Sequence, residues 1–155
     1  MLCALLNSEE EIMSASADEL AIRQLAARYI DAVNRRDEGD WTATWSRDGV
    51  WNLMGMQVSG RDAVVATWKG AMGTFRWVVM VLGSGTIELD GDTASGRWYL
   101  TEHLVGQDGN ALMVLGVYDD RYCREEGAWV FSERRYQMLY RGAVEMAGQW
   151  QPYQA

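Results

Sequence analysis

Two adjacent residues of the sequence could exchange a proton near neutral pH: Glu102 and the single histidine, His103. Both belong to the segment from Ala94 to Val105, whose alternating pattern predicts a β-strand. Side chains alternate between the two faces of a strand, so Glu102 and His103 are expected to point in opposite directions. A register shift of one residue would exchange them. Each face of this strand therefore carries one potential general acid or base.

Metal and nucleotide chemistry fit the sequence poorly. Cys3 and Cys123 are far apart and, with one histidine, form no usual zinc site. The acidic pairs in Asp90-Gly91-Asp92 and Asp119-Asp120 are typical of solvated turns. Gly83-Ser84-Gly85 lacks the spacing and the following helix of a phosphate loop. We therefore expect no metal and no cofactor.

The composition limits the partners and the compartment. A formal net charge of −8 opposes binding to nucleic acid or to an anionic membrane. Eight Trp and seven Tyr against two Phe supply many rings with a polar edge, which suit a binding pocket as well as a core. No apolar run reaches the roughly 18 residues of a membrane helix. Two cysteines outside any disulfide pattern favour a cytoplasmic protein.

The length of 155 residues and the hydrophobic fraction of 48% fit one domain with its own core. Residues 1–15 are too short and too acidic for a signal peptide, and we expect a loose leader there, with Met13 as an alternative start. Residues 16–142 are expected to form the domain, and residues 143–155 a tail without defined structure.

Three helices are predicted in the first half of the chain. Ser16-Ala17-Asp18-Glu19 has the spacing of a capping box and is expected to open an amphipathic helix. The polar segment 35–40 ends that helix. A short second helix with Trp41 and Trp45 follows, and a third covers about residues 60–72.

Four long strands joined by short turns are predicted in the second half, at residues 75–89, 94–105, 112–124 and 128–140. Gly83-Ser84-Gly85 permits a bulge in the first of them. Gly127 supplies left-handed backbone for the turn of the last hairpin. Helices followed by antiparallel strands predict an α+β fold, in which the helices cover one face of a strongly curved sheet.

Several segments, taken in order, resemble a known family. They are Tyr29 to Gly39, Trp41 to Trp51, Gly60-Arg61, Gly96 to Glu102, and the closing hairpin from Gly116 to Tyr136. Together they resemble the SnoaL-like proteins of the NTF2-like superfamily, in the branch that includes scytalone dehydratase, the polyketide cyclases and hexachlorocyclohexane dehydrochlorinase. The similarity extends over roughly residues 18–141.

This resemblance implies an NTF2-like cone, in which three N-terminal helices pack on a strongly curved, mostly antiparallel sheet that encloses a pocket. The implied partner is a small hydrophobic molecule. The resemblance also implies a homo-oligomer, a dimer or a trimer, which contacts the outer face of the sheet. The outer-face residues expected to take part are Arg97, Tyr99, Tyr122 and Phe131.

The enzymes of this branch resemble one another in using an Asp–His pair, in which the Asp orients an imidazole that removes a proton. In this sequence the Asp position falls on Asn34 and the His position on Met80. Neither residue takes up a proton at neutral pH. The resemblance therefore implies the fold and the reaction class without the usual catalytic pair.

Matching the strands to the family, with Leu100 facing the pocket, selects a different set of residues. The implied catalytic residues are Glu102, Arg134 and Tyr118. The implied substrate-binding residues are Tyr29, Asn34, Trp51, Met80, Trp98, Leu100, Val114 and Tyr136. Such an aromatic chamber with a few convergent polar groups is typical of a small-molecule site.

Each of these roles has a structural alternative. Glu102 could form a buried ion pair with Arg134 or Arg97, because an unpaired buried charge is costly. Asn34 could cap the end of its helix. His103 fits a surface or subunit contact on the outer face.

Three functions follow from the sequence. The first is a cofactor-independent lyase or isomerase, of dehydratase or cyclase type, that acts on a hydrophobic cyclic hydroxy- or keto-compound. The second is a small-molecule-binding protein that has lost the family pair. The third is a structural subunit that resembles the β subunits of ring-hydroxylating dioxygenases.

Overall fold

The computed structural model describes residues 2–154 and the side chains of residues 12–154. Three helices precede or interrupt a six-stranded sheet. The helices are α1 (Leu2–Arg35), α2 (Glu38–Ala43) and α3 (Arg61–Gly73). The strands are β1 (Trp45–Leu53), β2 (Met56–Ser59), β3 (Phe75–Asp90), β4 (Thr93–Gly106), β5 (Ala111–Glu125) and β6 (Ala128–Ala143).

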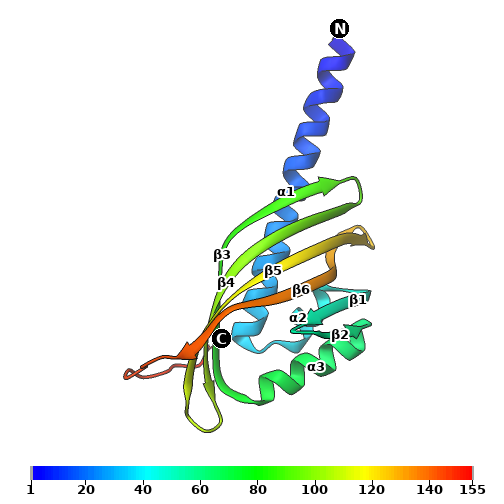
Figure 1. Cartoon of the computed structure of the whole chain (residues 1–155). Helices are drawn as coiled ribbons and strands as arrows, with labels where there is room; N and C mark the ends of the chain where they lie inside the picture. The colour runs from blue at the N-terminus through cyan, green and yellow to red at the C-terminus, as the bar shows by residue number, and fades with distance from the viewer. Residues whose placement is uncertain (1, 155) are drawn as a thin grey trace.

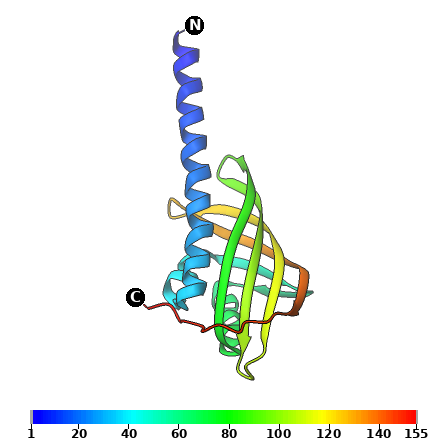
Figure 2. The same cartoon turned by 90° about the vertical axis from the view of Figure 1, so that its left-hand side faces the viewer.

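The sheet has the strand order β2-β1-β6-β5-β4-β3. All neighbours are antiparallel except β1 and β6, which pair in parallel. The sheet curves without closing, and the helices lie on its concave side (Figures 1 and 2). The predicted α+β fold with a curved, mostly antiparallel sheet is confirmed.

An aromatic cluster joins the helices to the short strands. Trp41 of α2 stacks on Trp68 of α3 with ring centroids 4.7 Å apart. Tyr29 of α1 contacts Trp41 at 5.4 Å and Phe131 of β6 at 5.5 Å. Trp45, expected in the second helix, instead begins β1 and is fully buried. Because large rings bury much apolar surface, this cluster fixes α1 and α3 against one end of the sheet.

The first helix begins earlier than the sequence predicted. The segment Leu2–Arg35 contains neither Gly nor Pro, so nothing local stops the helix before Ser16. The expected capping box therefore lies inside α1, and the expected loose leader is helical from Leu2. Its N-terminal part extends beyond the sheet (Figure 1). Asp18 caps no helix; its carboxylate accepts hydrogen bonds from Arg124 and Trp129.

A Schellman motif ends α1 and sets the position of its last turn. The N–H of Asp37 donates to the carbonyl of Ala32, and the N–H of Arg36 to that of Val33. Arg36 adopts left-handed backbone with φ of 57°. Its guanidinium donates to the carbonyls of Met72 and Phe75, which offsets the strain of a non-glycine residue there.

The predicted bulge in β3 is confirmed. The register of β3 against β4 shifts between Leu82 and Gly85. A Cβ on Gly85 would lie 2.1 Å from Cε3 of Trp98, so only glycine leaves room for that buried ring. The bulge therefore allows the sheet to bend over the indole of Trp98.

Two residues assigned to the outer face of the sheet are buried instead. Tyr122 and Phe131 are 1% and 0% exposed. On β5, the side chains of every second residue from Tyr118 to Tyr122 point to the inner face. In β6, one extra residue between Phe131 and Glu133 reverses which face the alternate side chains point to. Arg97 and Tyr99 are exposed as expected, and the homo-oligomer stays a prediction.

The chain after Ala143 has no regular helix or strand up to residue 154. It nevertheless returns across the sheet (Figure 2). Trp77 of β3 donates to the carbonyl of Gln151 at 3.1 Å, and Arg76 lies over the ring of Trp150. Within residues 2–154, no helix has the length and apolar character needed to cross a bilayer.

Candidate active site

A cavity of about 390 Å³ lies between the inner face of the sheet, α1 and α3. Most of its wall is apolar, and α3 supplies one side with Trp68 and Met72. Glu102 and Arg141 are the two charged residues among the described residues that line it. Further apolar lining comes from Val33, Leu53, Phe75, Val78, Leu104, Leu112 and Met138. A largely apolar cavity with a few polar groups is suited to a small organic ligand.

Seven of the eleven residues selected from the sequence line this cavity. They are Glu102, Tyr118, Tyr29, Trp51, Met80, Val114 and Tyr136. The other four do not reach it. Trp98 and Leu100 are buried farther along β4, Arg134 lies behind the tyrosines, and the Asn34 amide is occupied by the backbone of β3.

Glu102 is the carboxyl group of the cavity. It pairs across the sheet with Met80 of β3 and Val114 of β5, and all three side chains line the same wall. Burial raises the pKa of Glu102 to about 7, and the hydroxyl of Tyr136, which donates over 3.4 Å, opposes the rise. His103 is its neighbour on the opposite face. Glu102 can therefore exchange a proton near neutral pH.

The room for Tyr136 comes from a glycine on the neighbouring strand. A Cβ on Gly116 of β5 would lie 2.5 Å from Cε2 of Tyr136. Without a side chain at Gly116, the ring of Tyr136 packs directly against Gly116 and brings its hydroxyl to Glu102. This glycine therefore positions the hydrogen-bond donor of the carboxyl group.

The ion pair between Glu102 and an arginine, the structural alternative to a catalytic role, does not form. Arg97 instead pairs with Asp119 on the outer face, with Nε and Oδ1 2.7 Å apart. Arg134 pairs with Asp120, with Nε–Oδ1 and Nη2–Oδ2 distances of 2.8 and 2.7 Å. Within residues 12–154, Glu102 has no cationic partner. Burial raises the pKa of Glu102, and no cation beside the carboxyl group lowers it again.

Asp120 was expected in a solvated turn, and that expectation is wrong. Asp120 is 3% exposed and forms a two-bond fork with Arg134, whose side chain is fully buried. Asp120 also accepts from the hydroxyl of Tyr122, which accepts in turn from Trp98 Nε1. Alternation from Tyr118 through Asp120 to Tyr122 was the signal that places it inside.

The buried guanidinium supports the cavity from behind. Its carbon atom lies 3.8 Å from the ring centroid of Tyr118 and 4.2 Å from that of Tyr29. Such cation–π contacts fix the two rings. Burial raises the pKa of Tyr118 well above its usual range, so its hydroxyl stays protonated and can donate a hydrogen bond. Arg134 therefore acts on the cavity through Tyr118.

Asn34 and Met80, the positions matched to the family pair, contact each other. Asn34 Nδ2 donates to the carbonyl of Met80 at 2.9 Å, and the N–H of Met80 donates to Asn34 Oδ1 at 2.7 Å. The amide thus pairs with β3 as a strand would, and holds α1 against the sheet. It neither caps the helix nor points a free group into the cavity.

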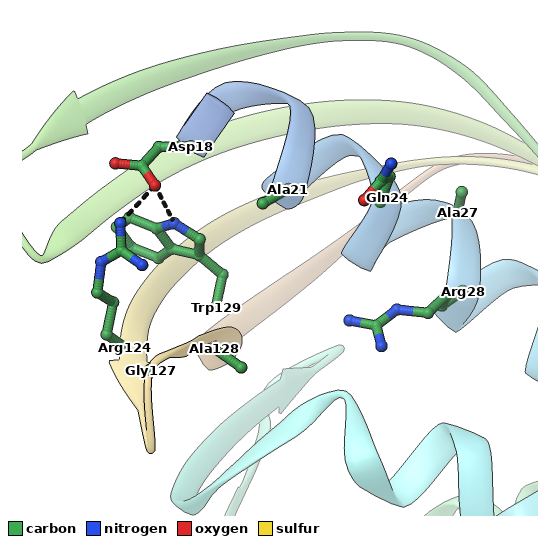
Figure 3. A pocket seen from close by; sticks show the side chains of 9 residues that line it. All are labelled: Asp18, Ala21, Gln24, Ala27, Arg28, Arg124, Gly127, Ala128 and Trp129. Atoms are coloured by element: carbon green, nitrogen blue, oxygen red, sulfur yellow. Dashed lines mark hydrogen bonds and ion pairs between the residues drawn. The ribbon is translucent and has the colours of Figure 1, made fainter. Parts of the chain in front are cut away.

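A second hollow of about 530 Å³ lies between α1 and the turn from β5 to β6. Figure 3 shows Asp18 bridging Arg124 and Trp129 on one side, with Arg28 on another. Hydrogen bonds from Trp129 and Arg124 lower the pKa of Asp18. This carboxylate is already paired, so it has no proton-transfer role like that available to Glu102.

Comparisons with known proteins agree with this geometry. A SnoaL-like domain family matches residues 14–135, and the chain therefore belongs to that family. Gamma-hexachlorocyclohexane dehydrochlorinase of Sphingobium indicum is 28% identical over 133 residues, covering 76% of this chain and 78% of the relative. An uncharacterised protein of Mycobacterium tuberculosis is 26% identical over 132 residues, covering 83% and 90%.

Among solved structures, a hexachlorocyclohexane dehydrochlorinase of type 2 superposes with a TM-score of 0.82. The match covers 90% of this chain and 97% of that chain at 19% sequence identity. At this identity the likeness concerns the fold. The family match confirms the expected resemblance to the SnoaL-like proteins, and the superposition agrees with the expected fold.

Removal of the Asp120 carboxylate should strongly destabilise the protein. Asp120→Asn leaves Arg134 as an uncompensated buried charge, and we expect a loss of about 3–5 kcal/mol in the free energy of unfolding. The matched control is Asp119→Asn, which breaks only the exposed pair with Arg97 and should cost less than about 1 kcal/mol. Urea unfolding measures both, and equal losses would contradict the structure.

Neutralising Glu102 should stabilise the protein in a pH-dependent way. The folded-state pKa of about 7 exceeds the ordinary value of 4.5, so ionised Glu102 destabilises the fold at high pH. Glu102→Gln should therefore be more stable than wild type by up to about 3 kcal/mol at pH 8. The gain should shrink between pH 7 and 4.5 and vanish below.

The measurement is urea unfolding at several pH values, with exposed Glu88→Gln on β3 as the control. Glu88→Gln should show no comparable pH-dependent gain. A Glu102→Gln difference that is constant from pH 4 to pH 8 would mean that Glu102 is solvated in the native state.

Proposed function

We propose that the protein is a cofactor-independent lyase or isomerase that moves a proton on a hydrophobic cyclic hydroxy- or keto-compound. The observation that carries this proposal is the carboxyl group of Glu102 in an apolar cavity, with a pKa of about 7 and no cation beside it among residues 12–154. A general base works best when its pKa lies near the ambient pH.

In the proposed reaction, ionised Glu102 removes a proton from a carbon atom next to a carbonyl or a leaving group. The electrons of the broken C–H bond form a double bond, and charge develops on the carbonyl oxygen or on the leaving group. Tyr118 faces the cavity as a neutral phenol and donates to that charge. Glu102 then returns its proton to another carbon atom in an isomerisation, or to the leaving group or water in an elimination.

The remaining residues orient the ligand or the catalytic groups. Tyr29, Trp51 and Val114 provide apolar wall against which a ring can pack. Tyr136 donates to Glu102 and directs the carboxyl group. Arg134 is a positioning residue, because it contacts the ring of Tyr118 and does not line the cavity.

The family supports the reaction class. The dehydrochlorinase of Sphingobium indicum is named for an elimination from a chlorinated ring, and a 28% identical relative is a reasonable guide to chemistry of that type. In this chain, Glu102 takes the place of the Asp–His pair and removes the proton that starts the elimination.

The competing function is a binding protein without turnover. It is favoured by Asn34 and Met80, because the Asn34 amide binds the backbone of Met80 and neither residue provides an acid or base. A structural subunit without a working site would be expected to fill its cone with side chains, whereas this chain keeps a cavity of about 390 Å³. The absence of an ion pair at Glu102 among residues 12–154 favours the enzyme over the binding protein.

The deciding experiment compares wild type with Glu102→Gln. A thermal-shift screen of cyclic ketones, hydroxysteroids, polyketide-like aromatics and cyclohexene diols first supplies a ligand class for turnover assays. Glu102→Gln should bind the same ligands and fold normally but lose about 10²–10⁴-fold in kcat. In wild type, kcat/KM should rise with pH through an apparent pKa near 7, because the base must be ionised.

Exposed Glu88→Gln is again the control and should keep full activity. An active Glu102→Gln enzyme would rule out this mechanism while leaving the fold unchanged. Ligand binding without turnover in wild type would favour the binding protein instead.

A further inference from the structure

The last strand contains a second irregularity, at the mouth of the cavity. Against β5, Gly116 pairs with Met138, whereas Leu115 pairs with Tyr140, so β6 has one extra residue at Leu139. Tyr136 and Met138 line the cavity, and simple alternation would continue with Tyr140. The extra residue reverses the alternation of side chains beyond it. Arg141 therefore lines the cavity, and Leu139 and Tyr140 are exposed. Bulges of this kind often re-aim a side chain beside a functional site.

Arg141 shares a row with the carboxyl group of the site. Met80, Glu102, Val114 and Arg141 are successive cross-strand partners on β3, β4, β5 and β6, and all four line the cavity. Neighbouring strands lie about 4.8 Å apart, so the backbones at Glu102 and Arg141 are separated by about 10 Å. A ligand a few ångströms across can therefore contact both residues.

The guanidinium of Arg141 is available for a ligand. Glu102 and Arg141 form no ion pair with each other, and no carboxylate within residues 12–154 lies within ion-pair distance of Arg141. Arg141 is itself exposed, as are Arg97 and Arg124, which pair with Asp119 and Asp18. Because the chain has a net charge of −8, its overall field repels anions, and any affinity for an acid must come from a local group.

We propose that Arg141 binds the carboxylate of a hydrophobic ring acid whose ring occupies the cavity and whose reacting carbon lies at Glu102. The guanidinium fork matches a carboxylate in two parallel hydrogen bonds. The distance between the two residues keeps the ligand carboxylate away from Glu102, which would otherwise repel it. This proposal rests on the proposed function for the role of Glu102 and adds the substrate class, an aromatic or alicyclic carboxylic acid.

Binding of unreactive probes tests this proposal separately from turnover. The probes are naphthalene-2-carboxylate and its neutral counterpart, naphthalene-2-carboxamide, titrated by calorimetry into wild type and Arg141→Gln. Wild type should bind the acid at least about tenfold more tightly than the amide, as expected for a hydrogen bond to a charged group. Arg141→Gln should lose that preference and keep its affinity for the amide.

The matched control is Arg135→Gln, which removes the same charge from an exposed position of the same strand. It should keep the preference for the acid. The proposal is overturned if wild type binds acid and amide equally, if it binds neither, or if Arg141→Gln keeps the preference. Glu102→Gln should bind the acid at least as tightly as wild type, so loss of turnover there tests the proposed reaction, and the acid preference tests Arg141.

Discussion

The candidate site depends on which carboxylate pairs with the buried guanidinium of Arg134. Arg134 is fully buried, yet its partner is Asp120 rather than Glu102. A guanidinium in this position needs a carboxylate, because an uncompensated buried charge is strongly destabilising. Asp120 meets that need from behind the tyrosine layer. Glu102 is thereby left in an apolar wall with only a phenol beside it, and its pKa rises to about 7. The ion pair between Arg134 and Asp120 is what leaves the Glu102 carboxyl group without a cation.

Irregular strands decide which side chains reach the cavity. Gly85 and Gly116 leave space for the rings of Trp98 and Tyr136, and the extra residue at Leu139 brings the exposed Arg141 into the lining of the cavity. A regular sheet of the same length would point Tyr140 to the cavity and Arg141 away from it. The bends that let the sheet curve around the helices are thus also the features that select the polar groups of the site.

The alternation of apolar and polar residues was sufficient to predict the strands where they are regular. It predicted the four long strands, and the match of those strands to the family then placed Glu102, Tyr118 and Tyr136 on the inner face. It failed at Phe131 and missed Arg141, because one extra residue reverses alternation and leaves no compositional mark. It also began α1 at Ser16, since a capping-box spacing does not stop a helix that has no Gly or Pro before it. The partner of Arg134 was missed because an Asp-Asp pair suggests a turn, whereas Asp120 is fixed by contacts distant in sequence.

A site with one titrating carboxyl group restricts the chemistry that it can complete. An Asp–His pair shares the work of orientation and proton removal, but here Asn34 and Met80 are used to join α1 to β3. In the proposed reaction, Glu102, the one carboxyl group among the described lining residues, must therefore both take and release each proton. In an isomerisation the same group returns the proton to the substrate, and the site is reset without help from solvent. In an elimination the proton must leave with the departing group or through the mouth of the cavity, and a pKa near 7 keeps that release fast at neutral pH.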